Sequence, residues 1–254
     1  MTLRLSLNTL EKIDETFIAF FVLERLGFPV QPLKPTSHTK GLNHVLHTIE
    51  AMEHTWSFKL ANQSKAFGQK VRGEMIKLWS VNRKTAGVLE GLVTATKAKR
   101  VLEIGTSAGY STLFLANGAM HNHGKVFTIE ALPEKILLAK KHFKQSGLKN
   151  ITLLEGNALK ILKTWKRGSV DFVFLDADKE NYGNYLRYLL PIMKVDALIV
   201  ADNINDYGHM MEDYLQRVTG THLPKSRVDK RVKSYYLAAL DNGLMVTRKI
   251  SNKK

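Results

Sequence analysis

Apolar positions from residue 99 onward follow two alternating patterns. Short apolar runs that end at a glycine, an acid or an amide predict strands at 99–105, 125–130, 151–156, 170–176 and 197–203. Between them, apolar residues recur at helical spacing, as in PEKILLAKKHFKQSG, where Pro133 and Gly147 mark the two helix ends. Strands that alternate with such helices indicate right-handed crossovers and a parallel, doubly wound α/β sheet.

The chain ahead of these strands shows helical spacing instead. Leu10, Ile13, Phe17 and Phe20 predict a helix over 8–26, and further helices are expected over 42–67 and 82–96. Three prolines between the first two helices indicate an extended link. We therefore expect residues 1–70 to form a helical extension, serving as a substrate wall or a dimer contact, ahead of a domain at 71–254.

The chain is expected to close with an antiparallel hairpin. YYLAAL at 235–240 and LMVTRK at 244–249 have strand character, and Asn242-Gly243 between them is a strong signal for a two-residue turn. Together with the five earlier strands, this hairpin predicts a mostly parallel seven-stranded sheet.

Composition limits the class of protein. The chain has 254 residues and 44% apolar content, enough for a packed core, and no apolar run approaches the roughly 18 residues that cross a bilayer. It contains no cysteine, which excludes disulfides, thiolate metal sites and a cysteine nucleophile. A cytoplasmic protein without a membrane span is expected.

The net charge of +15 is unevenly distributed. Basic residues exceed acidic ones at 61–100, 135–167 and 225–254, whereas 168–224 holds four basic and nine acidic residues. The basic excess is typical of a solvated surface or of a surface for an anionic partner such as RNA, and the sequence leaves both open. The acidic segment includes VDFVFLDADKENY, in which Asp176, Asp178 and Lys179 follow a buried strand.

Acids follow four of the five predicted strands. In an open parallel sheet, ligands bind outside the carboxyl ends of the strands, so Glu103, Glu130, Asp176 and Asp202 should face one cavity. Such a cavity is an unusual place for a nucleotide phosphate. One aspartate at a strand end is most often a helix cap, but a second acid and an amide, Asp202 and Asn203, on the neighbouring strand favour a metal site.

The turn after the first strand, GTSAGYS at 105–111, allows a ligand to approach the backbone. It does not match G-x-G-x-x-G, and the sequence contains no P-loop, which weakens dinucleotide and nucleoside triphosphate interpretations. Glu130, at the end of the second strand, can accept both hydroxyls of a ribose. With Glu103 nearby, these features favour an adenosyl ligand that carries positive charge, such as S-adenosylmethionine.

Several motifs together resemble a known family. VLEIGTSAGYSTLFLA, FTIEALPEKILLAKKHF, EGNAL, FVFLDADKENYGNYL and LIVADN are similar, in order and spacing over about 80–249, to the motifs of the cation-dependent O-methyltransferases that use S-adenosylmethionine. That group contains catechol and caffeoyl-coenzyme A O-methyltransferases and many bacterial relatives. The resemblance implies a Rossmann-like class I methyltransferase fold.

The resemblance also implies roles for individual residues. The implied cofactor contacts are Val81, Glu103, Gly105, Thr106, Ser111, Glu130, Ala158 and Asp178. The implied metal ligands are Asp176, Asp202 and Asn203, and Lys179 matches the position of the catalytic base, with Asp176 beside it. The helix dipole disfavours a lysine at the start of a helix, which independently suggests a chemical role for Lys179.

The chemistry of methyl transfer to a phenol agrees with this ligand set. A phenol has a pKa of about 10, and a divalent cation bound beside its hydroxyl lowers that pKa. Oxygen ligands favour Mg²⁺, with Mn²⁺ or Ca²⁺ as alternatives. The predicted function is O-methylation of a catechol-like small molecule by an expected homodimer. Methylation of a hydroxylated uridine in tRNA and a non-catalytic cofactor-binding protein are the alternatives.

Overall fold

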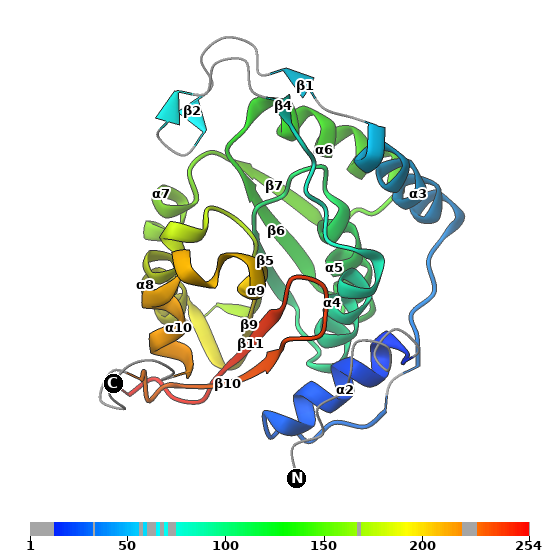
Figure 1. Cartoon of the computed structure of the whole chain (residues 1–254). Helices are drawn as coiled ribbons and strands as arrows, with labels where there is room; N and C mark the ends of the chain where they lie inside the picture. Colours follow the sequence, from blue (N-terminus) through cyan, green and yellow to red (C-terminus); the bar gives the residue numbers. More distant parts are fainter. Residues whose placement is uncertain are drawn as a thin grey trace.

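A seven-stranded sheet forms the centre of the molecule (Figure 1). The computed structural model describes residues 13–32, 34–55, 58–59, 65–66, 69–70, 75–166, 169–219 and 228–253. Within them the sheet order is β10-β11-β9-β8-β5-β6-β7. These strands are β5 (Arg100–Ile104), β6 (Lys125–Glu130), β7 (Ile151–Glu155), β8 (Val170–Leu175), β9 (Met193–Ala201), β10 (Val232–Leu237) and β11 (Leu244–Lys249).

Pairing within the sheet confirms the predicted topology. Strands β5 to β9 pair in parallel, while β11 is antiparallel to both β9 and β10. Leu175 at the end of β8 is in register with both Ile104 of β5 and Ala201 of β9. The three residues that follow, Gly105, Asp176 and Asp202, therefore leave the sheet side by side.

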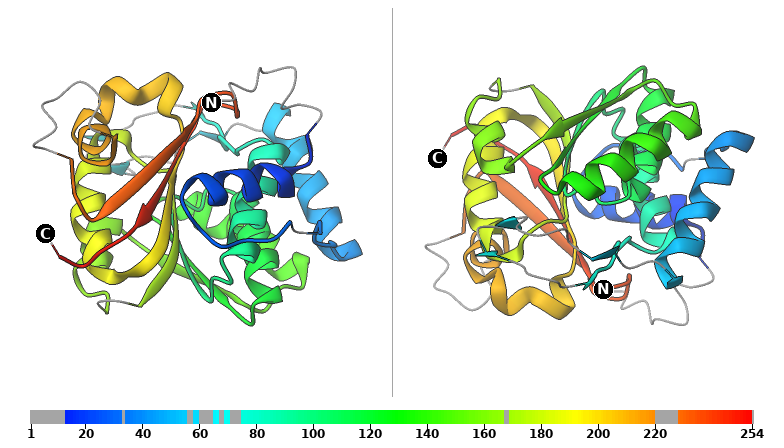
Figure 2. Two further views of the ribbon diagram at one scale, coloured as in Figure 1. Left: turned by 90° about the horizontal axis from the view of Figure 1, so that it is seen from below. Right: turned by 90° about the horizontal axis from the view of Figure 1, so that it is seen from above.

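Helices cover both faces of the sheet, as the two views of Figure 2 show. Alternate residues of β8 divide between the layers: Phe172 and Phe174 join one core, and Val173 and Leu175 join the other. On the first face lie α2 (Glu15–Arg25), α3 (Lys40–Thr55), α4 (Arg83–Ala95), α5 (Tyr110–His121) and α6 (Pro133–Ser146). On the second lie α7 (Ala158–Lys163), α8 (Tyr182–Ile192) and α10 (Glu212–Thr219).

Short elements complete the described residues. The connection after β8 contains η1 (Lys179–Asn181), and the connection after β9 contains α9 (Ile204–Tyr207) and η2 (Gly208–Met210). Two small antiparallel pairs lie between α3 and α4. They are β1 (Phe58–Lys59) with β4 (Met75–Ile76), and β2 (Lys65–Ala66) with β3 (Gln69–Lys70). No helix among the residues described has both the length and the apolar character of a membrane span.

The N-terminal helices share the core of the first face. Helix α2 begins at Glu15 because Asp14 caps it, accepting a hydrogen bond from the Thr16 amide at 2.8 Å. It packs closely on α4 at Gly91, where an added Cβ would lie 3.0 Å from that of Ala19. The expected helix over 8–26 is thus confirmed from Glu15 onward and wrong for Ile13 and Asp14, and 8–12 lie outside the described residues.

Two other predictions from the sequence are wrong in part. The helix expected over 42–67 is confirmed up to Thr55 and wrong at 58–59 and 65–66, which are strands, while 56–57, 60–64 and 67 lie outside the described residues. Beyond Thr55 the apolar residues Trp56, Phe58 and Leu60 alternate with polar ones, a period of two that favours a strand over a helix.

The closing hairpin has a longer loop than the two-residue turn predicted. Strand β10 ends at Leu237, which pairs with Leu244, so residues 238–243 form the connection. The carbonyls of Asn242 and Gly243 accept hydrogen bonds from the amides of Asn205 and Ile204, at 2.7 and 3.1 Å. The loop is thus hydrogen-bonded to α9, and β10 spans Val232–Leu237 instead of the predicted 235–240.

Helix α2 should contribute strongly to stability. Leu23 is fully buried in the first core, so Leu23→Ala should lower the free energy of unfolding by about 2–5 kcal/mol. Thermal and urea unfolding measure the loss, with the exposed neighbour Glu24→Ala as the matched control at within about 0.5 kcal/mol of the parent. Equal stability of the two variants would show that α2 does not belong to the core.

Candidate active site

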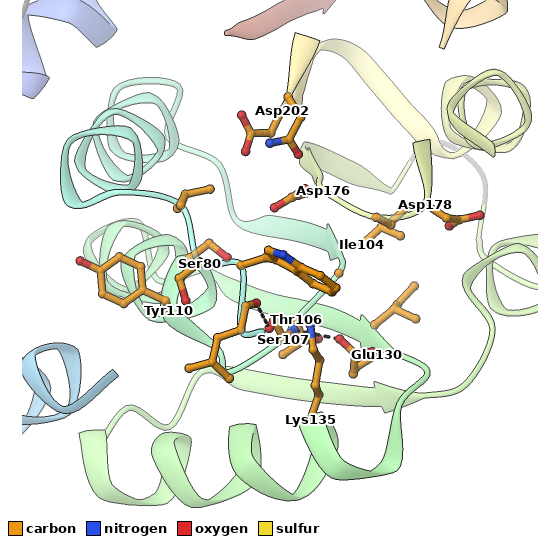
Figure 3. A pocket seen from close by; sticks show the side chains of 18 of the residues that line it. Ser80, Ile104, Thr106, Ser107, Tyr110, Glu130, Lys135, Asp176, Asp178 and Asp202 are labelled. Atoms are coloured by element: carbon orange, nitrogen blue, oxygen red, sulfur yellow. Dashed lines mark hydrogen bonds between the residues drawn. The ribbon is translucent and has the colours of Figure 1, made fainter. Parts of the chain in front are cut away.

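A cavity of about 910 Å³ opens at the carboxyl ends of the parallel strands (Figure 3). It lies at the point where the strand order reverses, between β5 and β8, which is where doubly wound sheets bind ligands. Every site residue predicted from the sequence lines it except Glu103. Asp176 and Asp202 lie at one end of the view in Figure 3, and Glu130 and Lys135 at the other.

The turn from β5 to α5 is built around two glycines with positive φ. Gly105 has a φ of +101°, and a Cβ added there would collide with the carbonyl oxygen of Asp176. Gly109, with a φ of +90°, is the N-cap of α5, where an added Cβ would press on the Phe143 ring. Only glycine at 105 allows the ends of β5 and β8 to approach this closely.

Glu103 lies behind the cavity wall. It is fully buried, and its carboxyl group accepts hydrogen bonds from the hydroxyls of Ser111 and Thr128, both at 2.6 Å, and from Thr112. Burial raises the pKa of Glu103 to about 7, although these hydroxyls oppose the shift. The side chain therefore supports Ser111, which faces the cavity in its place.

Glu130 is fixed by backbone amides. One carboxylate oxygen accepts from the amide of Ser107 at 2.8 Å, and the other accepts from Ala131 and Leu132 at 2.9 and 3.0 Å. The side chain is 7% exposed and lines the cavity. A carboxylate held in this way keeps one orientation and can accept hydrogen bonds from a ligand's hydroxyl groups.

The opposite end of the cavity holds two neighbouring carboxylates and a lysine. The Lys179 ammonium donates to Asp176 Oδ1 at 2.6 Å and lies 3.0 Å from the Tyr182 hydroxyl. Asp202 is 2% exposed, and its Oδ1 atom has no hydrogen-bond partner. Burial, followed by the charge of Asp176, raises the pKa of Asp202 to about 8.

An unpaired buried carboxylate oxygen beside a second carboxylate fits a bound cation. Asn203, with a φ of +66°, directly follows Asp202 and lines the same cavity. Over the described residues, no cluster of three or more histidine, aspartate or glutamate side chains is arranged to hold a metal. The candidate set instead has two carboxylates and one amide, all oxygen donors of the type that Mg²⁺ prefers.

The remaining predicted residues also face the cavity. Asp178 is oriented by the Tyr185 hydroxyl, which donates to its Oδ1 at 2.5 Å, and by the side-chain amide of Asn181. Ala158 is the first residue of α7 and is 7% exposed. Val81 lies two residues before α4, also at 7% exposure.

Several lining residues were not predicted. Helix α3 contributes Glu50 and Glu53, and Glu50 binds Arg83 at 2.9 Å and the Tyr110 hydroxyl. Lys135, in the first turn of α6, is 6% exposed, and burial lowers its pKa. Lys135 was detectable, because it opposes the helix dipole in the same way as Lys179.

The cavity is acidic although the chain is basic. Its charged lining residues are eight acids and three bases: Glu50, Glu53, Glu130, Asp176, Asp178, Asp202, Asp206 and Asp241, with Arg83, Lys135 and Lys179. Walls of one sign concentrate ions of the other, so the cavity favours a ligand that carries positive charge.

A parallel sheet in this strand order that ends in an antiparallel hairpin is the fold of Rossmann-like methyltransferases. A family profile described as O-methyltransferase matches residues 57–250, and the chain belongs to this family.

Curated relatives match over part of their length. A catechol O-methyltransferase of Mycobacterium tuberculosis is 40% identical over 123 residues, covering 48% of this chain and 56% of the relative. One from Niastella koreensis is 33% identical over 138 residues, covering 53% of this chain and 62% of the relative. The matches thus span little more than half of each relative.

Solved structures match over nearly the whole chain. The O-methyltransferase of Bacillus cereus in complex with SAH has a TM-score of 0.63 and 21% identity, covering 94% of this chain and 99% of that one. At this identity the similarity establishes the fold.

The pKa of Glu103 leads to a prediction about stability. Folding raises this pKa from 4.5 to about 7, so the folded protein retains a proton that the unfolded chain releases. The carboxyl group therefore reduces the stability of the fold as pH rises from 4.5 to about 7, and the reduction reaches its full size above pH 7. Glu103→Gln should accordingly gain stability over the parent at pH 8, on the order of 3 kcal/mol, and much less at pH 4.5.

Thermal unfolding of the ligand-free protein at both pH values measures the difference. Glu24→Gln on the exposed side of α2 is the control and should follow the parent at each pH. A gap between Glu103→Gln and the parent that is the same at both values would contradict the raised pKa.

Proposed function

We propose that this chain transfers the methyl group of S-adenosylmethionine to a hydroxyl of a catechol-like small molecule. The transfer uses a divalent cation, for which Mg²⁺ is the first candidate. The observation that carries this proposal is the buried, unpaired Asp202 Oδ1 beside Asp176 in an acid-lined cavity. Membership of the O-methyltransferase family supports the reaction class. The two catechol O-methyltransferases among the relatives support the acceptor class.

The cofactor assignment rests on the lining of the cavity. Glu130 offers carboxylate oxygens for ribose hydroxyls, and the Gly105–Thr106 turn leaves the backbone open to a ligand. Ser111 stands at the start of α5, where the helix dipole favours a carboxylate such as that of methionine. The Bacillus cereus relative, of the same fold, was solved with SAH.

Asp176, Asp202 and Asn203 would hold the cation. When bound, a divalent cation lowers the pKa of a neighbouring acceptor hydroxyl and so favours its nucleophilic form. Lys179 is held beside this set by Asp176 and Tyr182. We assign to its neutral amine form the proton that the hydroxyl loses, which leaves Lys179 as an ammonium paired with Asp176. The acceptor oxygen then forms a bond to the methyl carbon while the bond from carbon to sulfur breaks, leaving a neutral thioether.

The wall around the acceptor is proposed to include the N-terminal extension. Helix α3 lines the cavity with Ile49, Glu50 and Glu53, and the exposed aromatic residue Tyr207 also lines it. Planar aromatic acceptors suit such walls. A homodimer remains a prediction, with the exposed Phe17 of α2 as a candidate contact.

Metal dependence is tested with labelled S-adenosylmethionine offered with catechols, hydroxycinnamates or tRNA, with and without EDTA. We expect a catechol to be labelled, the activity to disappear with EDTA and Mg²⁺ to restore it. Asp202→Asn should lose more than the 10- to 100-fold typical of residues that only support a metal site. Asp206→Asn, an exposed acid on the same cavity, is the control. Equal turnover with and without EDTA contradicts the cation, and labelling of tRNA alone contradicts the acceptor.

The role of Lys179 is tested by Lys179→Ala. The change should lower kcat by about 10²- to 10⁴-fold, as expected for loss of a general base, and remove the basic-side dependence of the rate on pH. Calorimetric binding of SAH should stay near that of the parent, which would show that the cavity is intact. An unchanged rate and pH profile would exclude Lys179 as the base.

A further inference from the structure

The segment at 77–82, which we term the strap, borders the cavity ahead of α4 and carries Trp79. Three hydrogen bonds tie it to three parts of the fold. The Ser107 hydroxyl donates to the Leu78 carbonyl, the Ser80 amide donates to Glu53 at 3.3 Å, and the Asn82 amide donates to Asp241 at 3.3 Å. Trp79 has a φ of +54°, an uncommon backbone conformation for so bulky a residue.

The Trp79 indole is in contact with a buried cation. The Lys135 ammonium lies 4.9 Å from the centre of the ring, and the Trp79 side chain, at 63% exposure, lines the cavity. Within the described chain, Lys135 makes no hydrogen bond or ion pair, although Glu130, Asp176 and Glu53 act on it at longer range. Its direct partner is thus the face of the indole.

The carboxylates nearby are largely engaged. Both oxygens of Asp178 accept hydrogen bonds from Tyr185 and Asn181, and both oxygens of Glu130 accept backbone amides. A sulfonium has no N–H or O–H group to donate, so a hydrogen-bond acceptor of the protein cannot recognise it through a conventional hydrogen bond. The means of recognition that remain are the net negative charge of the cavity and an aromatic face.

We infer that Trp79 is the cation-recognition ring of this cavity, occupied by the Lys135 ammonium in the free protein and by the sulfonium of the methyl donor in the complex. The inference rests on the proposed use of S-adenosylmethionine. It makes Trp79 a specificity-determining residue, because the donor carries a sulfonium whereas its product SAH has a neutral thioether in the same place. The indole would therefore favour the donor over the product.

Isothermal titration calorimetry of the full chain with S-adenosylmethionine and with SAH tests this inference. The quantity to compare is the ratio of the two dissociation constants. Trp79→Leu should reduce the preference for the donor by about 2- to 30-fold, the range of a cation–π contact, and leave SAH binding nearly unchanged. Trp79→Phe should retain part of the preference. Phe17→Leu, an exposed aromatic on α2, should retain all of it.

A second variant tests the exchange of cations. Lys135→Met removes the competing ammonium and keeps the length of the side chain, so it should bind the donor more tightly relative to SAH. A weaker preference in this variant would overturn the exchange, and equal losses for both ligands in Trp79→Leu would overturn the recognition role. Failure of the parent protein to bind either ligand would instead reject the proposed cofactor, and the inference with it.

Discussion

At Gly105 the ends of β5 and β8 pass so close together that one added carbon atom would strike the carbonyl oxygen of Asp176. This approach joins the turn that faces a ligand to the strand end that supplies Asp176, so the two halves of the cavity have a fixed separation. The register of β8 extends the unit to Asp202, because Leu175 pairs with Ala201 as well as with Ile104. Backbone pairing between the strands thus sets the positions from which the side chains of the site project.

Charge is the second constraint on the site. Eight acids gather around one cavity in a chain whose net charge is +15, and two of them, Glu130 and Asp202, are buried, as is Glu103 behind the cavity wall. Asp202 and Glu103 show the cost, because burial raises the pKa of each toward neutrality. Positive ligands offset this cost, which couples their binding to the stability of the fold.

Much of the fold follows from local features of the sequence, and so does the position of several acids that line the cavity. Strand periodicity placed β5 to β8 to within about two residues, and the acids Glu130, Asp176 and Asp202 were identifiable because they end strands. Glu103 also lies near the end of a strand, but its side chain points away from the cavity toward the hydroxyls of Thr112 and Thr128. Only the folded structure brings these hydroxyls together.

The residues that were missed depend on tertiary contacts. Trp79 and Glu53 lie in segments whose pattern of apolar and polar residues does not predict that they will line a cavity at distant strand ends. The hairpin loop is similar, since Asn242-Gly243 has the chemistry of a tight turn and its actual path is set by contacts with Asn205 and Ile204. Local signals predict elements well, but they do not predict which surfaces these elements will share.

The hydrogen bond between Asn82 and Asp241 joins positions separated by 159 residues. During synthesis, the strap leaves the ribosome long before its partner exists, and domains of this kind complete their folding only when the remaining elements become available. A nascent chain that ends before the last hairpin therefore lacks one of the three attachments of the strap. The strap therefore has all three attachments only after both it and the loop that carries Asp241, 159 residues further along, have been synthesised.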